Sequence, residues 1–216
     1  MRVSSPAKPE ATGFVLAGGR SSRMGRDKAL AELEGRTLAA GAVNLLRSVG
    51  LAAAIAGARS ELEDIAPIVA DETPGLGPLS GICSALASRK AELGIFIPVD
   101  MPLLPASLLK YLLRHACITG SAVTLVSVNG FTQTFPVVLR REALSILRSE
   151  LAAGRRGCLS AFHAASLTLG EQIRPVPVEL LAQAGHLPDS RGLAPFQWFL
   201  NVNTPPDLER ARLSIA

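Results

Sequence analysis

The chain has 216 residues, of which 22 are Lys or Arg, 18 are Asp or Glu and 48% are hydrophobic, with a net charge of +4. This composition excludes a wholly disordered chain and a disulfide-dense mini-domain. No apolar run reaches the ~18 to 20 residues of a membrane span, although the mean hydropathy is +0.31. Residues 1–11 lack the apolar core of a signal peptide, so we expect them to be a flexible leader on a single cytoplasmic domain covering 1–216.

The first part of the chain predicts strands that alternate with helices. Short continuous apolar runs predict the strands, and apolar residues at helical spacing predict the helices. The predicted strands are residues 13–17, 52–56, 67–70, 94–99 and 122–128, and the predicted helices are 37–49, 60–66, 79–90 and 107–116. Apolar strands in this order indicate a parallel sheet covered on both faces.

From residue 131 onward the alternation becomes irregular. Strands are predicted at 135–139 and 173–178, helices at 141–151, 158–165 and 206–213, and a loop at 187–195. The sequence has no internal repeat and no low-complexity linker. We therefore expect one α/β domain with a decorated C-terminal third.

The basic residues are not distributed as in a nucleic-acid-binding protein, which interleaves a basic stripe with aromatics. Aromatic residues make up only 4% of the chain, and the densest basic cluster is the short stretch 20–28. Such a local patch suits a small phosphorylated ligand better than a polymer. We expect neither a nucleic-acid partner nor a membrane.

The first of three polar segments that follow predicted strands is LAGGRSSRMGRDK, residues 16–28. Ligands of open parallel sheets bind at such strand ends. Two adjacent glycines allow the backbone to approach an anion, and Arg20, Arg23 and Lys28 supply the cations that a polyphosphate requires. The Walker A pattern cannot be placed on the segment. The alternative is a solvated basic loop.

The second segment is DETPGLGPLSG, residues 71–81. Its three glycines nearly match a dinucleotide-binding fingerprint, but the third comes one residue late and Pro78 stands where the helix should begin. We interpret the segment as a turn that lets a ligand approach the backbone closely. The alternative is a plain loop.

The third segment is PVDMP, residues 98–102. Asp100 follows a strongly apolar strand, although Pro98 within that strand removes a ladder donor. An aspartate here can hold Mg²⁺, which prefers one or two carboxylates together with phosphates and water. The alternative role for Asp100 is to cap the following helix.

Nucleophilic and zinc chemistry have little support. Ser80 does not lie in a GxSxG elbow, and Trp198 stands among phenylalanines as in a packing cluster. The cysteines and histidines are scattered without ligand spacing, so we expect buried thiols and structural or solvated imidazoles. These residues are Cys83, Cys117, Cys158, His115, His163 and His186.

Four motifs in order resemble the molybdenum cofactor guanylyltransferase family of nucleotidyltransferases. They are LAGGRSSRMGRDKAL at 16–30, GPLSGI at 77–82, VDMP at 99–102 and NVNTPPDL at 201–208, and they span nearly the whole chain. The resemblance implies a three-layer α/β/α fold with a mostly parallel, Rossmann-like sheet. This fold is that of the nucleotide-diphospho-sugar transferases, the glycosyltransferase-A-like type.

The resemblance implies Mg²⁺-dependent transfer of GMP from GTP to the terminal phosphate of molybdenum-bound molybdopterin, with release of pyrophosphate. The implied catalytic residues are Lys28, Arg23 and Asp100, and Asp100 is also the implied metal ligand. The implied nucleotide-binding residues are Leu16, Ala17, Gly18, Gly19, Arg20, Lys28, Asp71, Gly77, Pro78 and Asp100. The candidates for the acceptor side are Asn201, Asn203, Arg155, Arg156 and Arg191. Transient contact with molybdoenzymes or their chaperones is a further expectation.

The sequence departs from the family in one place. Family members commonly carry an asparagine after the second strand, where this chain has IAGAR at 55–59. A cytidylyltransferase acting on the same pterin therefore stays open, as does a guanylyltransferase acting on a cobamide precursor. A non-catalytic nucleotide-binding regulator is a third possibility. The least favoured is a dinucleotide-dependent oxidoreductase that uses Gly75, Gly77 and Gly81.

Overall fold

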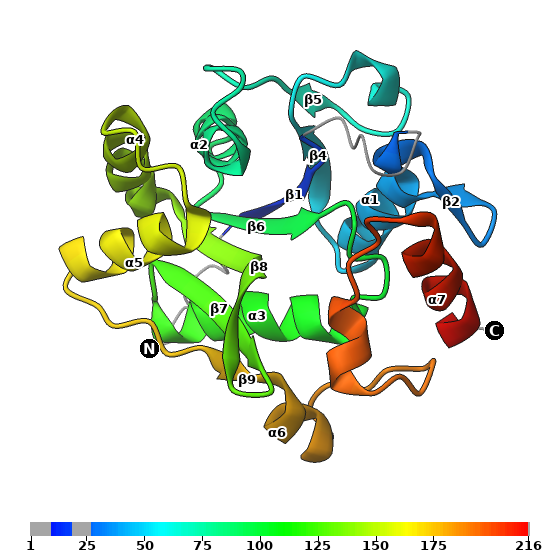
Figure 1. Cartoon of the computed structure of the whole chain (residues 1–216). Helices are drawn as coiled ribbons and strands as arrows, with labels where there is room; N and C mark the ends of the chain where they lie inside the picture. Colours follow the sequence, from blue (N-terminus) through cyan, green and yellow to red (C-terminus); the bar gives the residue numbers. More distant parts are fainter. Residues whose placement is uncertain (1–9, 19–26, 216) are drawn as a thin grey trace, which may run out of the picture.

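The computed structural model describes residues 10–18 and 27–215, which fold around a central seven-stranded sheet (Figure 1). The strand order is β5-β4-β1-β6-β8-β7-β9. Only β8 runs antiparallel to its neighbours in this sheet of the described residues, which confirms the predicted mostly parallel arrangement. The strands are β1 (Ala11–Leu16), β4 (Ala52–Ala56), β5 (Ile68–Val69), β6 (Leu93–Pro98), β7 (Val123–Val128), β8 (Phe131–Arg140) and β9 (Val176–Pro177).

Helices cover both faces of the sheet. The α-helices are α1 (Leu38–Ser48), α2 (Pro78–Ser88), α3 (Ala106–Thr119), α4 (Leu144–Ala152), α5 (Cys158–Thr168), α6 (Val178–Gln183) and α7 (Pro205–Ile215). Short 3₁₀ helices occur at η2 (Lys28–Leu30), η3 (Ser60–Leu62), η4 (Arg141–Ala143) and η5 (Pro195–Phe199), and β2 (Glu32–Leu33) pairs with β3 (Arg36–Thr37). No helix in the described ranges is long and apolar enough to cross a bilayer.

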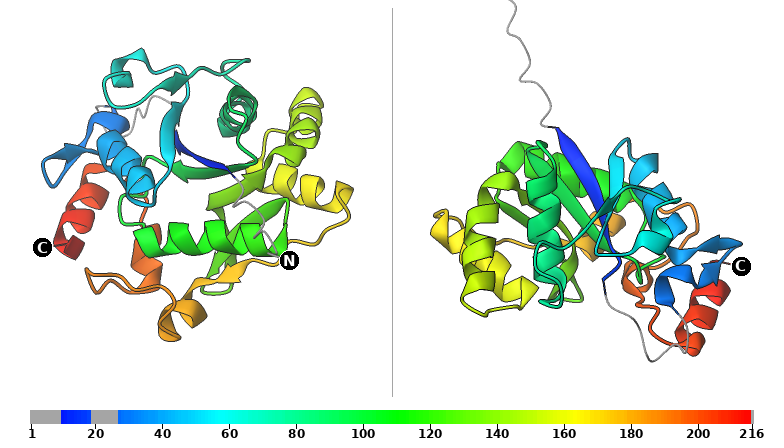
Figure 2. Two further views of the ribbon diagram at one scale, coloured as in Figure 1. Left: turned by 180° about the vertical axis from the view of Figure 1, so that it is seen from behind. Right: turned by 90° about the horizontal axis from the view of Figure 1, so that it is seen from above.

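Alternating residues of the strands build two separate cores, because successive side chains of a strand point to opposite faces. Phe14 and Phe96 stack on each other and pack with α2, α4 and α5 on one face. Val15 and Ile97 pack with α1 and α3 on the other face. Figure 2 shows the same three layers from behind and from above. The three-layer α/β/α prediction is confirmed.

The largest differences from the predicted elements lie after β7. The strand predicted at 135–139 is one arm of a longer hairpin, and the strand predicted at 173–178 shrinks to β9 and gives way to α6. Asn129 and Gly130 form the hairpin turn, both with positive φ. An Asn-Gly pair between apolar runs is a strong sequence signal for this turn. The predicted helix at 60–66 is only η3.

Candidate active site

A cleft of about 760 Å³ opens at the carboxyl ends of β1, β4, β5 and β6. This is the edge where open parallel sheets bind their ligands. Ten of the site residues that the resemblance implies line the cleft, although they come from separate segments of the chain. They are Leu16, Ala17, Gly18, Lys28, Asp71, Gly77, Pro78, Asp100, Asn201 and Asn203. The predicted Gly19, Arg20 and Arg23 lie outside the described residues.

Lys28, Asp100 and Asn203 meet in the cleft. The Lys28 ammonium donates to Asp100 Oδ2 at 2.9 Å and to Asn203 Oδ1 at 2.5 Å. The side chains of Lys28 and Asp100 are 16% and 20% exposed, so the ion pair is partly shielded yet open to a ligand. Asp100 is not a helix cap, because α3 begins only at Ala106 and its cap position is Pro105. Its placement favours the functional interpretation.

The NVNTPPDL motif reaches the cleft because it is tied to the end of β6 and to the start of α7. The Val202 amide donates to the Asp100 carbonyl at 2.8 Å. Asp207 Oδ2 accepts from the amides of Asn203 and Thr204, and the Thr204 hydroxyl accepts from the Asp207 amide. This reciprocal arrangement is a capping box. Hydrogen bonds from Thr204 and Arg210 lower the pKa of Asp207 to about 2.

Asp71 stands in the cleft wall, just after β5. Its Oδ1 is buried and has no hydrogen-bond partner, and burial raises the pKa of its carboxyl group. A Cβ at Gly81 would lie 3.1 Å from that oxygen, so glycine gives the carboxylate room against α2. A buried polar atom without a partner is costly, so a hydrogen-bond donor placed in the cleft would pair favourably with this oxygen.

The start of α2 differs from the prediction. In the sequence, Pro78 counts against a dinucleotide-binding fingerprint and the helix is predicted from residue 79, whereas in the structure Pro78 is itself the first residue of α2. Proline suits the first helical position, where its missing N–H removes no hydrogen bond. Gly77 precedes it with φ 84°, a left-handed conformation that favours glycine. The turn therefore brings backbone to the cleft edge, as interpreted from the sequence.

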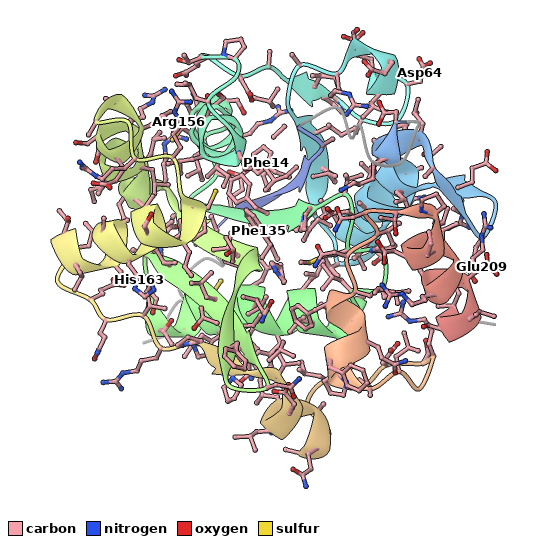
Figure 3. The ribbon with its side chains drawn as sticks, viewed as in Figure 1. Phe14, Asp64, Phe135, Arg156, His163 and Glu209 are labelled. Atoms are coloured by element: carbon pink, nitrogen blue, oxygen red, sulfur yellow. The ribbon has the colours of Figure 1, made fainter. Side chains whose placement is uncertain are left out.

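The three arginines predicted for the acceptor do not line the cleft. Arg155 pairs with Glu150, and Arg156 (labelled in Figure 3) lies in the loop between α4 and α5. Arg191 pairs with Asp189 at 3.0 Å and donates to the Leu103 carbonyl at 2.6 Å, within a second cavity. Their contact with an acceptor stays a prediction.

The cleft residues that were not assigned to the site from the sequence include Arg59 and Phe135. Arg59 follows β4 and donates to the Ala17 carbonyl, Asp27 and Glu61. Burial opposes its charge, but the hydrogen bonds to the two carboxylates raise the pKa of its guanidinium. Phe135 of β8 (labelled in Figure 3) also lines the cleft. Its ring packs edge to face on that of Phe162. The sequence offers one signal for Arg59, a lone arginine in the loop that follows an apolar strand.

The described cysteines and histidines add no second site. Cys83 and Cys158 are buried as predicted, and burial raises the pKa of each thiol to about 11. The prediction of burial is wrong for Cys117, which is only partly covered. Among the described residues, no group of three or more His, Cys, Asp or Glu side chains gathers as a metal site.

The donor set of the cleft fits a divalent cation that is shared with a ligand rather than caged by protein. Asp100 offers one carboxylate, and Asn201 and Asn203 line the same space. Mg²⁺ is typically bound through one or two carboxylates together with substrate phosphates and water. A lone carboxylate beside a lysine therefore suits a metal that arrives with a polyphosphate.

The fold and this cleft define a nucleotidyltransferase of the glycosyltransferase-A-like class. Residues 13–167 match the MobA-like NTP transferase domain, and the chain belongs to this family. It is 42% identical to a molybdenum cofactor guanylyltransferase from Xanthomonas euvesicatoria pv. vesicatoria over 154 residues, which are 67% of this chain and 74% of the relative.

Solved structures share the fold at low sequence identity. Molybdopterin-guanine dinucleotide biosynthesis protein A from Archaeoglobus fulgidus matches with a TM-score of 0.73 and 21% identity, covering 94% of this chain and 97% of its own. A Mycobacterium tuberculosis protein, crystallised in complex with manganese, matches with a TM-score of 0.60 and 18% identity, covering 95% of this chain and 100% of its own.

Proposed function

We propose that this protein transfers GMP from GTP to the terminal phosphate of molybdenum-bound molybdopterin and releases pyrophosphate. The observation that carries the proposal is the meeting of Lys28, Asp100 and Asn203. Asp100 and Asn203 lie 72 and 175 residues after Lys28 in the sequence, yet both accept a hydrogen bond from its ammonium group. The names of the relatives support the guanylyl group and the pterin acceptor. The cytoplasm is the proposed place of action.

The reaction joins two anions, so neutralising charge is the first requirement. An oxygen of the acceptor phosphate forms a bond to the α-phosphorus, and the bond from that phosphorus to the bridging oxygen breaks. Pyrophosphate leaves with the electron pair. The attacking phosphate is already ionised at neutral pH, so no general base is needed. Lys28 supplies positive charge to the phosphates, and the proposal also assigns phosphate contacts to Arg20 and Arg23.

Asp100 is the proposed ligand of Mg²⁺, with Asn201 and Asn203 at its side in the cleft. When bound, the metal supplies positive charge at the developing pyrophosphate. In the free protein Lys28 pairs with Asp100. We propose that a nucleotide draws Lys28 towards its phosphates and so frees the carboxylate for the metal.

The nucleotide half of the cleft is proposed to lie along β1, β4 and β5. There the Asp71 Oδ1 lacks a partner, and a ribose hydroxyl or a base N–H of the nucleotide would supply one. The backbone of Leu16, Ala17, Gly18, Gly19, Gly77 and Pro78 is assigned to the same nucleotide. The acceptor is proposed to lie towards β6 and β8, with Asn201, Asn203 and Phe135 along the cleft wall.

The first experiment measures thermal stabilisation by GTP, CTP, ATP and NADPH, each with and without Mg²⁺. A ligand at a hundredfold excess over its dissociation constant stabilises the folded protein by ~2.7 kcal/mol. We expect a Mg²⁺-dependent shift with GTP alone, followed by pyrophosphate release when molybdenum-bound molybdopterin is added. Lys28→Ala and Asp100→Ala should abolish turnover while both variants stay folded, and Lys90→Ala, at an exposed site, is the matched control.

The remaining outcomes each remove part of the proposal. If the protein prefers CTP, the transferred group is cytidylyl instead of guanylyl, and the proposed mechanism stands. GTP binding without transfer to the pterin leaves a regulator or a different acceptor. A shift with NADPH alone, independent of Mg²⁺, or wild-type turnover by Lys28→Ala, contradicts nucleotidyl transfer at this cleft.

A further inference from the structure

Arg59 is a buried cation in the wall of the cleft that the nucleotidyl-transfer reaction itself does not use. Only 7% of the residue is exposed. Each nitrogen of its guanidinium is engaged: Nε donates to Glu61 Oε1 at 2.7 Å, Nη1 donates to the Ala17 carbonyl at 2.7 Å, and Nη2 pairs with Asp27 Oδ2. Two carboxylates offset its charge. Arg59 is therefore occupied by protein rather than poised for a phosphate.

The partners of Arg59 stand at two places that matter for the ligand. Ala17 follows β1 and lines the cleft, and Asp27 directly precedes Lys28. In sequence these two residues lie on either side of 18–26, yet one guanidinium contacts both. A planar fork with several donors can hold two such partners in a fixed relation, and a single ammonium cannot.

Asp27 links Arg59 to the backbone around Lys28. Asp27 Oδ1 accepts from the Ala29 amide at 2.9 Å and so caps η2, the 3₁₀ turn that begins with Lys28. The two oxygens of one carboxylate thus join Arg59 to the start of that turn. From the first residue of the same turn, the Lys28 ammonium reaches Asp100 and Asn203.

We propose that Arg59 is a positioning residue for nucleotide binding: it fixes Asp27 against the end of β1 and thereby holds Lys28 in the cleft. The inference rests on the proposed function, since it requires that a nucleotide binds in the cleft and contacts Lys28. When the backbone of Lys28 is already held at the cleft, only its side chain has to turn from Asp100 to the phosphates, which lowers the ordering cost at the moment of binding. The loss of Arg59 should therefore act on nucleotide affinity.

The experiment compares Arg59→Met and Arg59→Lys with a matched control, Arg140→Met. Arg140 is also a partly buried arginine whose side chain contacts a carboxylate, Glu92, and a carbonyl, Ala116, but it lies opposite Leu93, at the far end of β6 from the cleft. The dissociation constant of GTP with Mg²⁺ is measured by calorimetry, and the melting temperature of each variant by fluorescence.

Both Arg59 variants should bind GTP about tenfold more weakly or worse, the scale of one lost hydrogen bond to a charged group. Arg140→Met should lower the melting temperature to a comparable extent and keep the wild-type dissociation constant. Wild-type affinity in Arg59→Met, or equal weakening in Arg59→Met and Arg140→Met, overturns the proposal.

Asp27→Asn gives a second measurement that does not depend on Arg59→Met folding. The amide oxygen of asparagine still caps η2, but the ion pair with Arg59 is lost. If the pair acts as a unit, Asp27→Asn weakens GTP binding, and adding Arg59→Lys to it weakens binding less than the two single effects combined. Fully additive effects contradict the proposal.

A last measurement needs no nucleotide, so it tests the role of Arg59 independently of the proposed function. Hydrogen exchange at the Ala29 amide, which donates to Asp27, should be faster in Arg59→Lys than in the wild-type protein and unchanged in Arg140→Met. If the wild-type protein binds no nucleotide, the proposed function fails, and this exchange rate still decides whether Arg59 orders η2. Unchanged exchange in Arg59→Lys overturns the positioning role.

Discussion

The Asp71 carboxylate, a proposed nucleotide contact, makes the free protein less stable. Its Oδ1 is buried without a partner, and burial raises the pKa of the group above the ordinary value of 3.8. Buried polar atoms are usually paired, and leaving one unpaired is costly. The proposed nucleotide offers the missing donor, so the same atom that weakens the free protein strengthens the complex.

This cost predicts a pH-dependent effect of Asp71→Asn. A carboxyl group whose pKa is raised in the folded state binds its proton more tightly there than in the unfolded state. Its contribution to stability therefore falls as the pH rises from the unfolded-state pKa through the folded-state pKa. Above the raised pKa the charged form destabilises the fold. Asp71→Asn should therefore melt at a higher temperature than the wild-type protein at pH 7, and the difference should shrink as the pH falls through the raised pKa towards the ordinary value of 3.8.

The measurement is the melting temperature of both proteins from pH 7 down to pH 3.5, with GTP binding measured at pH 7. We expect the free variant to gain stability and to lose nucleotide affinity, because the amide replaces one acceptor oxygen by a donor group. A difference in melting temperature that stays constant across this range, or that reverses its sign, contradicts the assignment.

The sequence could place a residue in the cleft by one of two signals: the residue follows a predicted apolar strand, or it belongs to a motif. Lys28, Asp71 and Asp100 meet this description, and all three line the cleft. Arg59 was not singled out, because its importance comes from contacts with Ala17 and Asp27, which are 42 and 32 residues away in sequence. Such contacts form only when the parallel strands bring their ends together, and no local pattern records them.

At the scale of elements, a small hydrogen-bond network caps the start of α7. The Thr204 hydroxyl donates to Asp207 Oδ2 at 2.7 Å, and the amides of Asn203 and Thr204 donate to the same oxygen. The network orients the backbone of Asn203, whose side chain meets Lys28 in the cleft. A helix cap and a binding residue are thus adjacent in one motif.

Thr204→Ala should lower the free energy of unfolding by about 1 kcal/mol, the usual contribution of a hydroxyl N-cap. The variant loses both the donor to Asp207 and the acceptor of the Asp207 amide. Thr204→Ser, which keeps the hydroxyl, is the control and should retain nearly all of the stability. Urea unfolding of the three proteins measures the effect, and equal loss in both variants would falsify the capping role.

Elements built from long apolar runs could be predicted, whereas short ones could not. The strand predicted at 52–56 is β4 to the residue, and the helix predicted at 37–49 is α1 with one residue removed at each end. The region after residue 131 was less predictable. There β9 has only two residues and α6, which follows it directly, has only six, so each element is too short to show a periodicity in the sequence.

At the scale of the whole molecule, the C-terminal third packs on the same core as the first strands. Trp198 is 1% exposed and belongs to the hydrophobic cluster that also holds Val15 and Ile97. Its indole nitrogen donates to Asp189 at 2.9 Å. The prediction of a packing role for Trp198 is confirmed, and the shared cluster supports the proposal that residues 1–216 form one domain.

One domain predicts one unfolding transition. Trp198 is the only tryptophan of the chain, so its fluorescence reports on the C-terminal third, whereas far-ultraviolet circular dichroism reports on all the helices and strands. If the third packs as part of one cooperative unit, the two signals should give the same urea midpoint and the same slope. A fluorescence midpoint at lower urea would mean that residues around Trp198 detach first. The C-terminal third would then be a separate unit, and Asn201 and Asn203 would leave the cleft before the strands that carry Asp71 and Asp100 unfold.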